Sequence, residues 1–164
     1  MSEEPSQADI LAALSAQTFR SRAPPSTTTW SEFRGQGEGE AGPSTNVTRI
    51  YCFRETCGSL ILLQNVAEST STPSPIFPVE SNSPYPPPST PTHLWHVKGA
   101  PMAFENIGFS RNSSAGVPDD APGGKDGRAV KWLICAECDA GPIGWSYDGG
   151  KEAWLAADRV RYGT

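Results

Sequence analysis

Residues 48–58 read TRIYCFRETCG and residues 130–145 read VKWLICAECDAGPIGW. Each stretch runs from a β-branched, apolar segment into a close pair of cysteines, with a glycine soon after the second cysteine. Structural zinc sites usually bind four thiolates supplied by two such turns, with two to four residues between the cysteines of a pair. The pattern therefore predicts one structural zinc ion that joins two strand ends through Cys52, Cys57, Cys135 and Cys138.

The composition favours metal ligation over disulfide bonds. The first residues, MSEEPSQADILAAL, lack a basic segment and a long apolar segment, and no stretch has the roughly eighteen apolar residues needed to span a bilayer. We therefore expect a location in the cytoplasm or nucleus without direct membrane insertion, where thiols stay reduced. The formal charge is −5 and the 13 Lys and Arg form no run, so we expect no nucleic-acid partner.

The cysteines have two other interpretations. They could be small buried apolar residues, or a redox pair, for which the Cys135 to Cys138 spacing alone would suffice. Neither interpretation explains the first pair. His93 and His96 are another source of ligands, but four thiolates already complete a tetrahedral site.

The fold class is predicted to be mainly β, with small antiparallel sheets around one zinc. Large apolar residues gather in the blocks 47–66, 94–110 and 128–163. The first block predicts a hairpin, Gly99-Ala100-Pro101 divides the second into two strands, and the turn Asp148-Gly149-Gly150 separates strands in the third. No strong helix is expected after Val47.

Segments rich in Pro, Ser, Gly and Glu are predicted to lie outside the folded domain. Residues 1–46 are expected to be a disordered tail with a short helix over 8–19 capped by Asp9, and 47–164 the domain, with disordered inserts at 68–92 and 112–127. Trp30 and Phe33 are interpreted as incidental aromatics or as a short docking segment. Residues 86–88 serve as a spacer or as a polyproline ligand for an aromatic groove.

With both cysteine pairs placed, three further segments carry a resemblance. FENIGFSR at 104–111, CAECDAGPIGW at 135–145 and AADRVRY at 156–162 resemble the Rab-interacting-factor family of zinc-binding guanine-nucleotide release factors, suppressors of Rab secretion defects. The resemblance implies a β-tent fold. The four residues between Cys52 and Cys57 are similar to the fungal branch, since animal members tend to have two.

The resemblance implies a function and a set of contact residues. It implies a non-catalytic release factor or chaperone for nucleotide-free Rab-type small GTPases in post-Golgi secretory transport, monomeric, cytoplasmic, and at membranes only through the Rab. The partner-binding residues it implies are Trp95, Met102, Phe104, Glu105, Asn106, Ile107, Gly108 and Phe109. Because side chains alternate along a strand, we expect some of the apolar members to lie in the core. One departure is Ala100, where some members carry an acid, which argues against vigorous exchange.

Two alternatives differ in class. A zinc-stabilised protein-interaction module without exchange activity would have the same cysteines. An enzyme resembling the zinc-containing methionine sulfoxide reductases would need a further cysteine as nucleophile, and all four here are committed to the metal.

Overall fold

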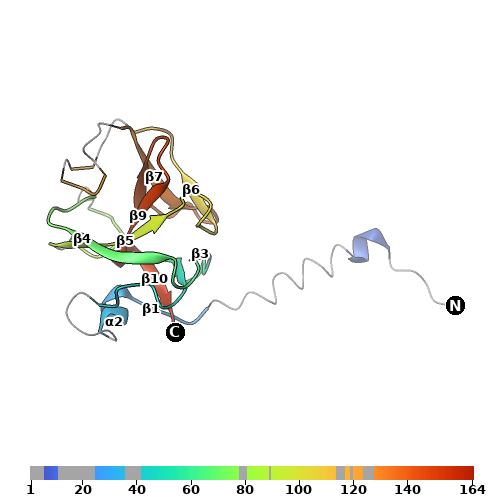
Figure 1. Ribbon diagram of the computed structural model, residues 1–164. Coiled ribbons are helices and arrows are strands. Elements are labelled where there is room, and N and C mark those ends of the chain that lie inside the picture. Colours follow the sequence, from blue (N-terminus) through green and yellow to red (C-terminus); the bar gives the residue numbers. More distant parts are fainter. Residues whose placement is uncertain are drawn as a thin grey trace.

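The computed structural model describes residues 6–10, 25–35, 42–77, 81–88, 90–113, 117–118, 120–123 and 128–164. The described part is mainly β, as the sequence predicts, and consists of two antiparallel sheets (Figure 1). No helix in this part is long and apolar enough to cross a membrane.

The smaller sheet has four strands in the order β1-β10-β2-β3. Its centre pairs the last strand of the chain with the first strand of the predicted hairpin, Val160 opposite Cys52. The strands are β1 (Thr27–Thr28), β10 (Val160–Gly163), β2 (Ile50–Cys52) and β3 (Leu60–Leu62). The hairpin predicted around the first cysteine pair is thus confirmed as β2 and β3.

The larger sheet has six strands in the order β4-β5-β9-β8-β7-β6. The interruption predicted at Gly99 separates β5 from β6, and the turn at Gly149 separates β8 from β9. A 3-10 helix, η2 (Ala157–Arg159), carries the chain from this sheet into β10 of the other. The strands are β4 (Ala67–Thr72), β5 (Thr92–Lys98), β9 (Glu152–Ala156), β8 (Gly144–Tyr147), β7 (Val130–Cys135) and β6 (Ile107–Phe109).

The core lies between the sheets and centres on Trp95 and Tyr162, both fully buried. The Trp95 indole N–H donates to the Tyr162 hydroxyl at 2.8 Å, and this hydroxyl donates to the Ala157 carbonyl at 2.6 Å. These bonds satisfy the polar ends of two large rings, which burial would otherwise leave unpaired. A second apolar cluster stacks Trp145 on Trp154 across β8 and β9.

The N-terminal prediction is wrong for residues 25–35. Strand β1 pairs with β10, and helix α2 (Trp30–Arg34) packs on the smaller sheet. Phe33 stacks on Tyr162 with ring centroids 4.3 Å apart, and both Trp30 and Phe33 are buried. The aromatic side chains are anchors of the domain, which therefore begins before residue 47.

The helix predicted over 8–19 is described only in part. Residues 7–10 are helical, and Ser6 caps them, since its hydroxyl accepts a hydrogen bond from the Asp9 N–H at 3.2 Å. Asp9 lies inside the turn and accepts from Ser6 in return, so it is not the cap that the sequence suggested. Residues 11–19 lie outside the described residues.

The prediction for the Pro-rich insert 68–92 is also wrong in part. Residues 67–72 form β4, which pairs with β5 over six positions. Phe77 and Tyr85 are buried, and they lie against the Arg159 guanidinium, whose carbon is 4.0 Å and 4.3 Å from the two ring centroids. Arg159 also donates to the Pro142 carbonyl at 2.9 Å. The described part of the insert is therefore held against the rest of the domain by the cation–π contacts of Arg159 and by burial of its aromatic side chains.

The second insert, 112–127, is likewise held where it is described. Ser113 bridges to Val130 at the start of β7, and Ala121 is buried in the cluster of Trp145 and Trp154. Residues 114–116, 119 and 124–127 lie outside the described residues.

Asn46 joins the two sheets at the turn between β3 and β4. Its side chain is fully buried, and its amide nitrogen donates to the Thr48 and Leu63 carbonyls at 3.1 and 2.8 Å. Its amide oxygen accepts from the Val66 and Ala67 N–H groups at 2.9 and 2.7 Å. One side chain therefore satisfies four backbone groups around this turn.

Candidate functional site

The first cysteine turn leaves strand β2 and returns into β3. Cys52 donates its N–H to the Ser59 carbonyl at 2.8 Å, which closes the hairpin at its base. Both Cys57 and Gly58 donate to the Arg54 carbonyl, at 3.0 and 3.2 Å. Gly58 has a φ of 61°, a conformation that suits glycine because it has no Cβ. The backbone folds back on itself and aims both sulfurs into the same space.

The second cysteine turn leaves strand β7 and leads to β8. Cys135 donates its N–H to the Ala140 carbonyl at 2.9 Å, while its own carbonyl accepts from the Asp139 N–H at 2.9 Å. Asp139 has a left-handed φ of 59°, which short polar side chains tolerate better than most. The turn places the Cys138 sulfur beside that of Cys135.

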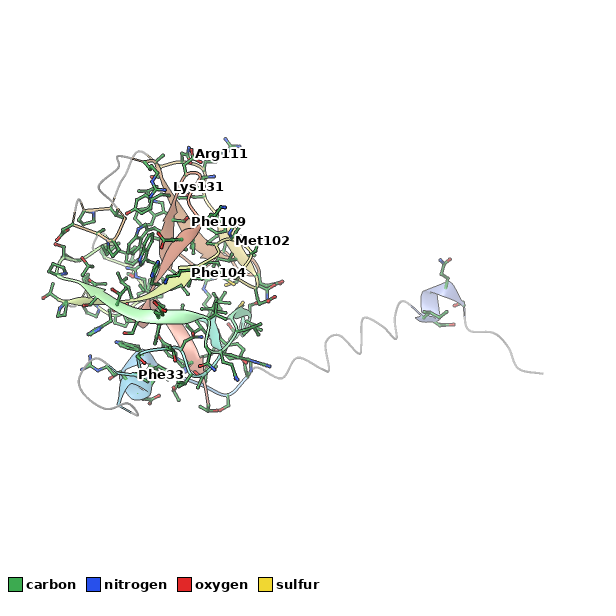
Figure 2. All side chains as sticks on the ribbon, viewed as in Figure 1. Phe33, Met102, Phe104, Phe109, Arg111 and Lys131 are labelled. Atoms are coloured by element: carbon green, nitrogen blue, oxygen red, sulfur yellow. The ribbon has the colours of Figure 1, made fainter. Side chains whose placement is uncertain are left out.

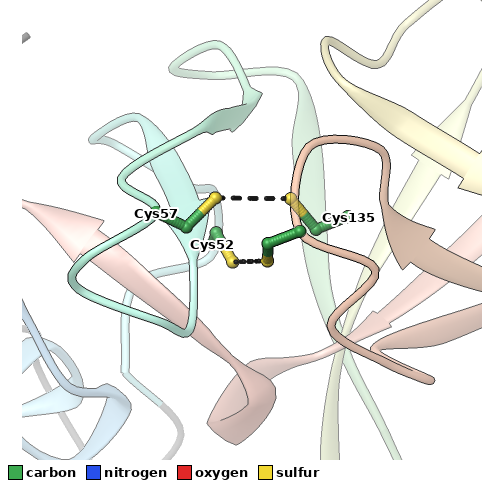
Figure 3. A group of neighbouring side chains, drawn as sticks. Cys52, Cys57 and Cys135 are labelled. Atoms are coloured by element: carbon green, nitrogen blue, oxygen red, sulfur yellow. Dashed lines mark hydrogen bonds between the residues drawn. The ribbon is translucent and has the colours of Figure 1, made fainter.

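The four sulfurs converge between the two turns (Figure 3). Cys52 Sγ lies 3.5 Å from Cys138 Sγ, Cys57 Sγ lies 3.8 Å from Cys135 Sγ, and all four are within 4.8 Å of one another. These separations are far longer than the roughly 2.05 Å of a disulfide. Metal–sulfur distances of about 2.3 Å place the sulfurs of a tetrahedral site about 3.8 Å apart. The cluster therefore fits one metal ion and is consistent with zinc.

The pKa values of the thiols differ because burial and hydrogen bonding differ among Cys52, Cys57 and Cys135. Burial raises the pKa of Cys52 and of Cys135 above the ordinary value for a thiol. Burial also disfavours the Cys57 thiolate, but hydrogen bonds from the Ser59 hydroxyl and backbone outweigh it, and the pKa of Cys57 falls to about 7. A bound divalent ion would hold these groups as thiolates and displace their protons.

One side chain bridges the two turns outside the sulfur cluster. Arg54, in the first turn, donates from Nη1 to the Cys138 carbonyl at 3.1 Å. A cation next to four thiolates reduces the unfavourable charge of the site. The two histidines take no part: His96 pairs with Glu152 at 3.0 Å, and His93 packs against Trp30. Among the described residues, the cluster contains cysteines alone.

A loop between β5 and β6 lies between strand β3, which follows the first cysteine turn, and the second cysteine turn. Glu105 donates its N–H to the Ile61 carbonyl at 2.9 Å, and Asn106 Nδ2 donates to the Leu60 carbonyl at 3.1 Å, so β3 holds the loop on one side. On the other side, Ala136 of the second cysteine turn donates to the Asn106 carbonyl at 2.8 Å. A metal that joins the two turns would therefore also fix this loop.

The loop and strand β6 form a mixed apolar and polar surface. Met102 is 90% exposed, Glu105 and Asn106 are exposed, and Ile107 and Phe109 are half-buried. Figure 2 shows Met102 and Phe109 in the upper right part of the domain, whereas Phe33 lies at the bottom. We refer to residues 102–109 as the β6 surface.

Two of the residues predicted to contact a partner are buried, although one of them, Phe104, belongs to the segment 102–109. Trp95 is fully buried in the core, because its side chain belongs to the inward face of β5, so the prediction of a contact role is corrected. Phe104 is 8% exposed and packs edge-on against Phe109 at 6.5 Å, so it supports the surface from below. Gly108 is half-buried and packs against Ile134. A Cβ at this position would lie 3.1 Å from Ile134 Cγ1, so a larger residue would require Ile134 to shift.

Two cations beside the β6 surface were not predicted. Arg111 is exposed just beyond β6, and Lys131 pairs with Asp148 at 3.5 Å (Figure 2). Lys131 and Phe109 share the lining of a cavity of about 190 Å³. Lys131 lies next to Phe109 only because β6 pairs with β7, a register that the sequence does not reveal.

A family model described as Mss4 protein matches residues 45–162, which is more than half of the chain. The chain belongs to the Mss4 family. Both cysteine turns and the β6 surface lie inside the matched range, and α2 lies outside it. The family predicted from the three quoted segments is thereby confirmed, while closeness to its fungal branch stays a prediction.

A relative of the Mss4 family is similar over a shorter range. It is a guanine nucleotide exchange factor MSS4 homolog from Drosophila melanogaster, 39% identical over 67 residues. The aligned part is 41% of this chain and 43% of that protein, so the chain spans less than half the length of this curated relative.

Proposed function

We propose that this chain is a guanine-nucleotide release factor for a Rab-type small GTPase, and that it binds the nucleotide-free GTPase through the β6 surface. Membership of the Mss4 family and the name of the fly relative support exchange activity. The structural observation that carries the proposal is the loop at Glu105 and Asn106, which is hydrogen-bonded both to β3 and to the second cysteine turn.

The metal in this proposal is one structural zinc ion held by Cys52, Cys57, Cys135 and Cys138. A site of four thiolates has no open position for a substrate, which suits a structural role. The site joins the β2–β3 hairpin of one sheet to the β7–β8 turn of the other. Zinc would cross-link the two turns, and would so keep the β6 surface in one conformation.

An exchange factor of this kind needs no nucleophile or acid–base pair. It acts because it binds the empty GTPase more tightly than the loaded one, and linkage then weakens nucleotide binding by the same factor. A preference of about 4 kcal/mol loosens nucleotide roughly a thousandfold. The same preference would let the protein act as a chaperone that holds the empty GTPase. The role is therefore contact without covalent chemistry.

The proposed location and cellular process follow from the proposed Rab partner. Rab-type GTPases direct vesicle-mediated transport, so the protein would act as a cytoplasmic monomer in secretory traffic and reach membranes through its lipidated partner. Glu105 and Asn106 are the polar groups placed to contact the GTPase, and Met102 and Phe109 are the apolar ones.

The experiment is a nucleotide-release assay with a Rab GTPase loaded with a fluorescent guanine nucleotide. Glu105→Ala and Asn106→Ala should each slow the accelerated release at least tenfold, the equivalent of about 1.4 kcal/mol of lost contact. Glu68→Ala is the matched control, because Glu68 is an exposed acid on β4, the opposite edge of the larger sheet. Unchanged release by both variants, together with no complex with the empty GTPase, would refute the proposal.

A further inference from the structure

A cavity of about 350 Å³ opens between α2, the first cysteine turn and the Pro-rich segment. Its volume lies within the roughly 300–1,000 Å³ typical of small-ligand sites. Aromatic rings form two walls: Trp30 of α2 and Phe53, which follows Cys52. Pro86 forms a third wall. Among the described lining residues, the charged one is Asp158 of η2.

The Asp158 carboxylate has an unusual environment. It is half-buried, and no side chain in the described part of the chain donates a hydrogen bond to it or forms an ion pair with it. Burial raises the pKa of Asp158, against the opposing charge of Arg159, a hydrogen bond from the Asp158 backbone N–H and the charge of His93. Arg159 does not cover the carboxylate from the cavity side, since its guanidinium lies between Phe77 and Tyr85. An acceptor for a cation therefore remains at the cavity wall.

We propose that this cavity binds the side chain of a lysine or arginine from a partner protein. A carboxylate and aromatic faces together are the groups that recognise a desolvated cation, through an ion pair and through cation–π contacts. Trp30 and Phe53 line the cavity with aromatic rings, and Asp158 supplies the charge. The formal charge of −5 favours the approach of a basic segment over an acidic one.

The cavity is separate from the β6 surface and does not depend on the proposed exchange activity. Its Trp30 wall lies outside residues 45–162, the range that matches the Mss4 family, and its Pro86 wall belongs to the Pro-rich insert. The two aromatic walls are held firmly: the ring centroids of Trp30 and Tyr162 are 5.8 Å apart, and those of Phe53 and Tyr85 are 4.9 Å apart. The aromatic part of the binding site is therefore preformed.

The test is an NMR titration of the metal-loaded full chain, following the Trp30 indole N–H. The probes are capped tripeptides with central lysine or arginine, the same tripeptide with norleucine as the neutral control, and free n-butylammonium. We expect saturable shifts with at least one basic tripeptide and none with norleucine. Asp158→Asn should weaken the basic tripeptide at least tenfold, and Asp148→Asn, which removes an equal charge from an exposed site, should leave it unchanged.

Several outcomes would overturn the proposal. They are no saturable shift with either basic tripeptide, equal binding of norleucine, or binding of free n-butylammonium alone, which would assign a small amine instead. Should Asp158→Asn fail to fold, Phe53→Leu replaces it, because leucine keeps an apolar wall and removes the ring. Binding of the basic tripeptide must then fall at least threefold, and an unchanged affinity would count against the cation site.

Discussion

Replacement of Asn46 by alanine should be among the most destabilising single changes outside the cysteines. The side chain is fully buried and makes four hydrogen bonds of 2.7 to 3.1 Å to backbone groups. Each buried group left without a partner costs about 1–3 kcal/mol, and water entering the space would relieve part of this. We expect a loss of about 3–5 kcal/mol, a large fraction of the roughly 5–15 kcal/mol that stabilises a domain.

The assay is equilibrium unfolding of the metal-loaded protein in urea, followed by tryptophan fluorescence. Asn46→Asp should also destabilise strongly, because it turns a carboxylate oxygen toward the Thr48 and Leu63 carbonyls. Gln64→Ala is the control, since Gln64 is exposed in the same turn, and its effect should stay within about 0.5 kcal/mol. A loss below about 1 kcal/mol for Asn46→Ala would show that the four bonds do not hold the sheets together.

Three further perturbations test the metal centre and the N-terminal anchor. Chelation, or Cys135→Ser, should abolish the cooperative thermal transition seen by calorimetry, since the binding of structural zinc contributes about 10–16 kcal/mol in zinc-finger peptides. An unchanged transition would show that the fold does not depend on a metal. Zinc affinity should fall as pH falls, because protons then compete with zinc for the thiols. The raised pKa values of Cys52 and Cys135 keep both protonated at neutral pH without metal, so zinc displaces at least two protons; its affinity should fall at least a hundredfold per pH unit in a competition titration, and a tenfold slope would contradict this. Phe33→Ala should lower the free energy of unfolding in urea by about 3–5 kcal/mol, whereas a change at the exposed Ser31, Ser31→Ala, should not. Equal effects of the two changes would show that α2 does not stabilise the domain.

The metal centre could be predicted from the sequence because its chemistry is local. Two cysteine pairs with metal-ligand spacing at strand ends suffice, and the structure brings all four sulfurs together. The strands of residues 47–66 and 128–163 were predictable for a similar reason, since runs such as SLILL and AVKWLI combine β-branched and apolar residues.

The N-terminal anchor could not be found in this way. Helix α2 has five residues, too few for a helical period, and it follows a stretch rich in Ser, Thr and Pro. Trp30 and Phe33 are buried because they pack against Tyr162, which lies far along the chain. A local sequence pattern does not detect such a distant contact. Strand β4, AESTST, was missed because it has no apolar alternation and is recruited by pairing with β5.

The contact residues were predictable only as a segment. Alternation along β5 and β6 required that some apolar side chains point inward, but it could not say which, and Trp95 and Phe104 are the buried ones. Asn46 carried no signal at all, because three of its four partners are backbone groups of the β3–β4 turn, which lies far along the chain.

The most direct measurement is complex formation between this protein and a set of purified Rab-type GTPases, each empty or loaded with GTP, by analytical gel filtration. The metal-loaded protein should form a stable one-to-one complex with at least one empty GTPase and none with its GTP-loaded form, and chelation should remove that complex. Equal binding to the empty and loaded forms, or none to either, would contradict the proposal that the metal-braced β6 surface selects the nucleotide-free state.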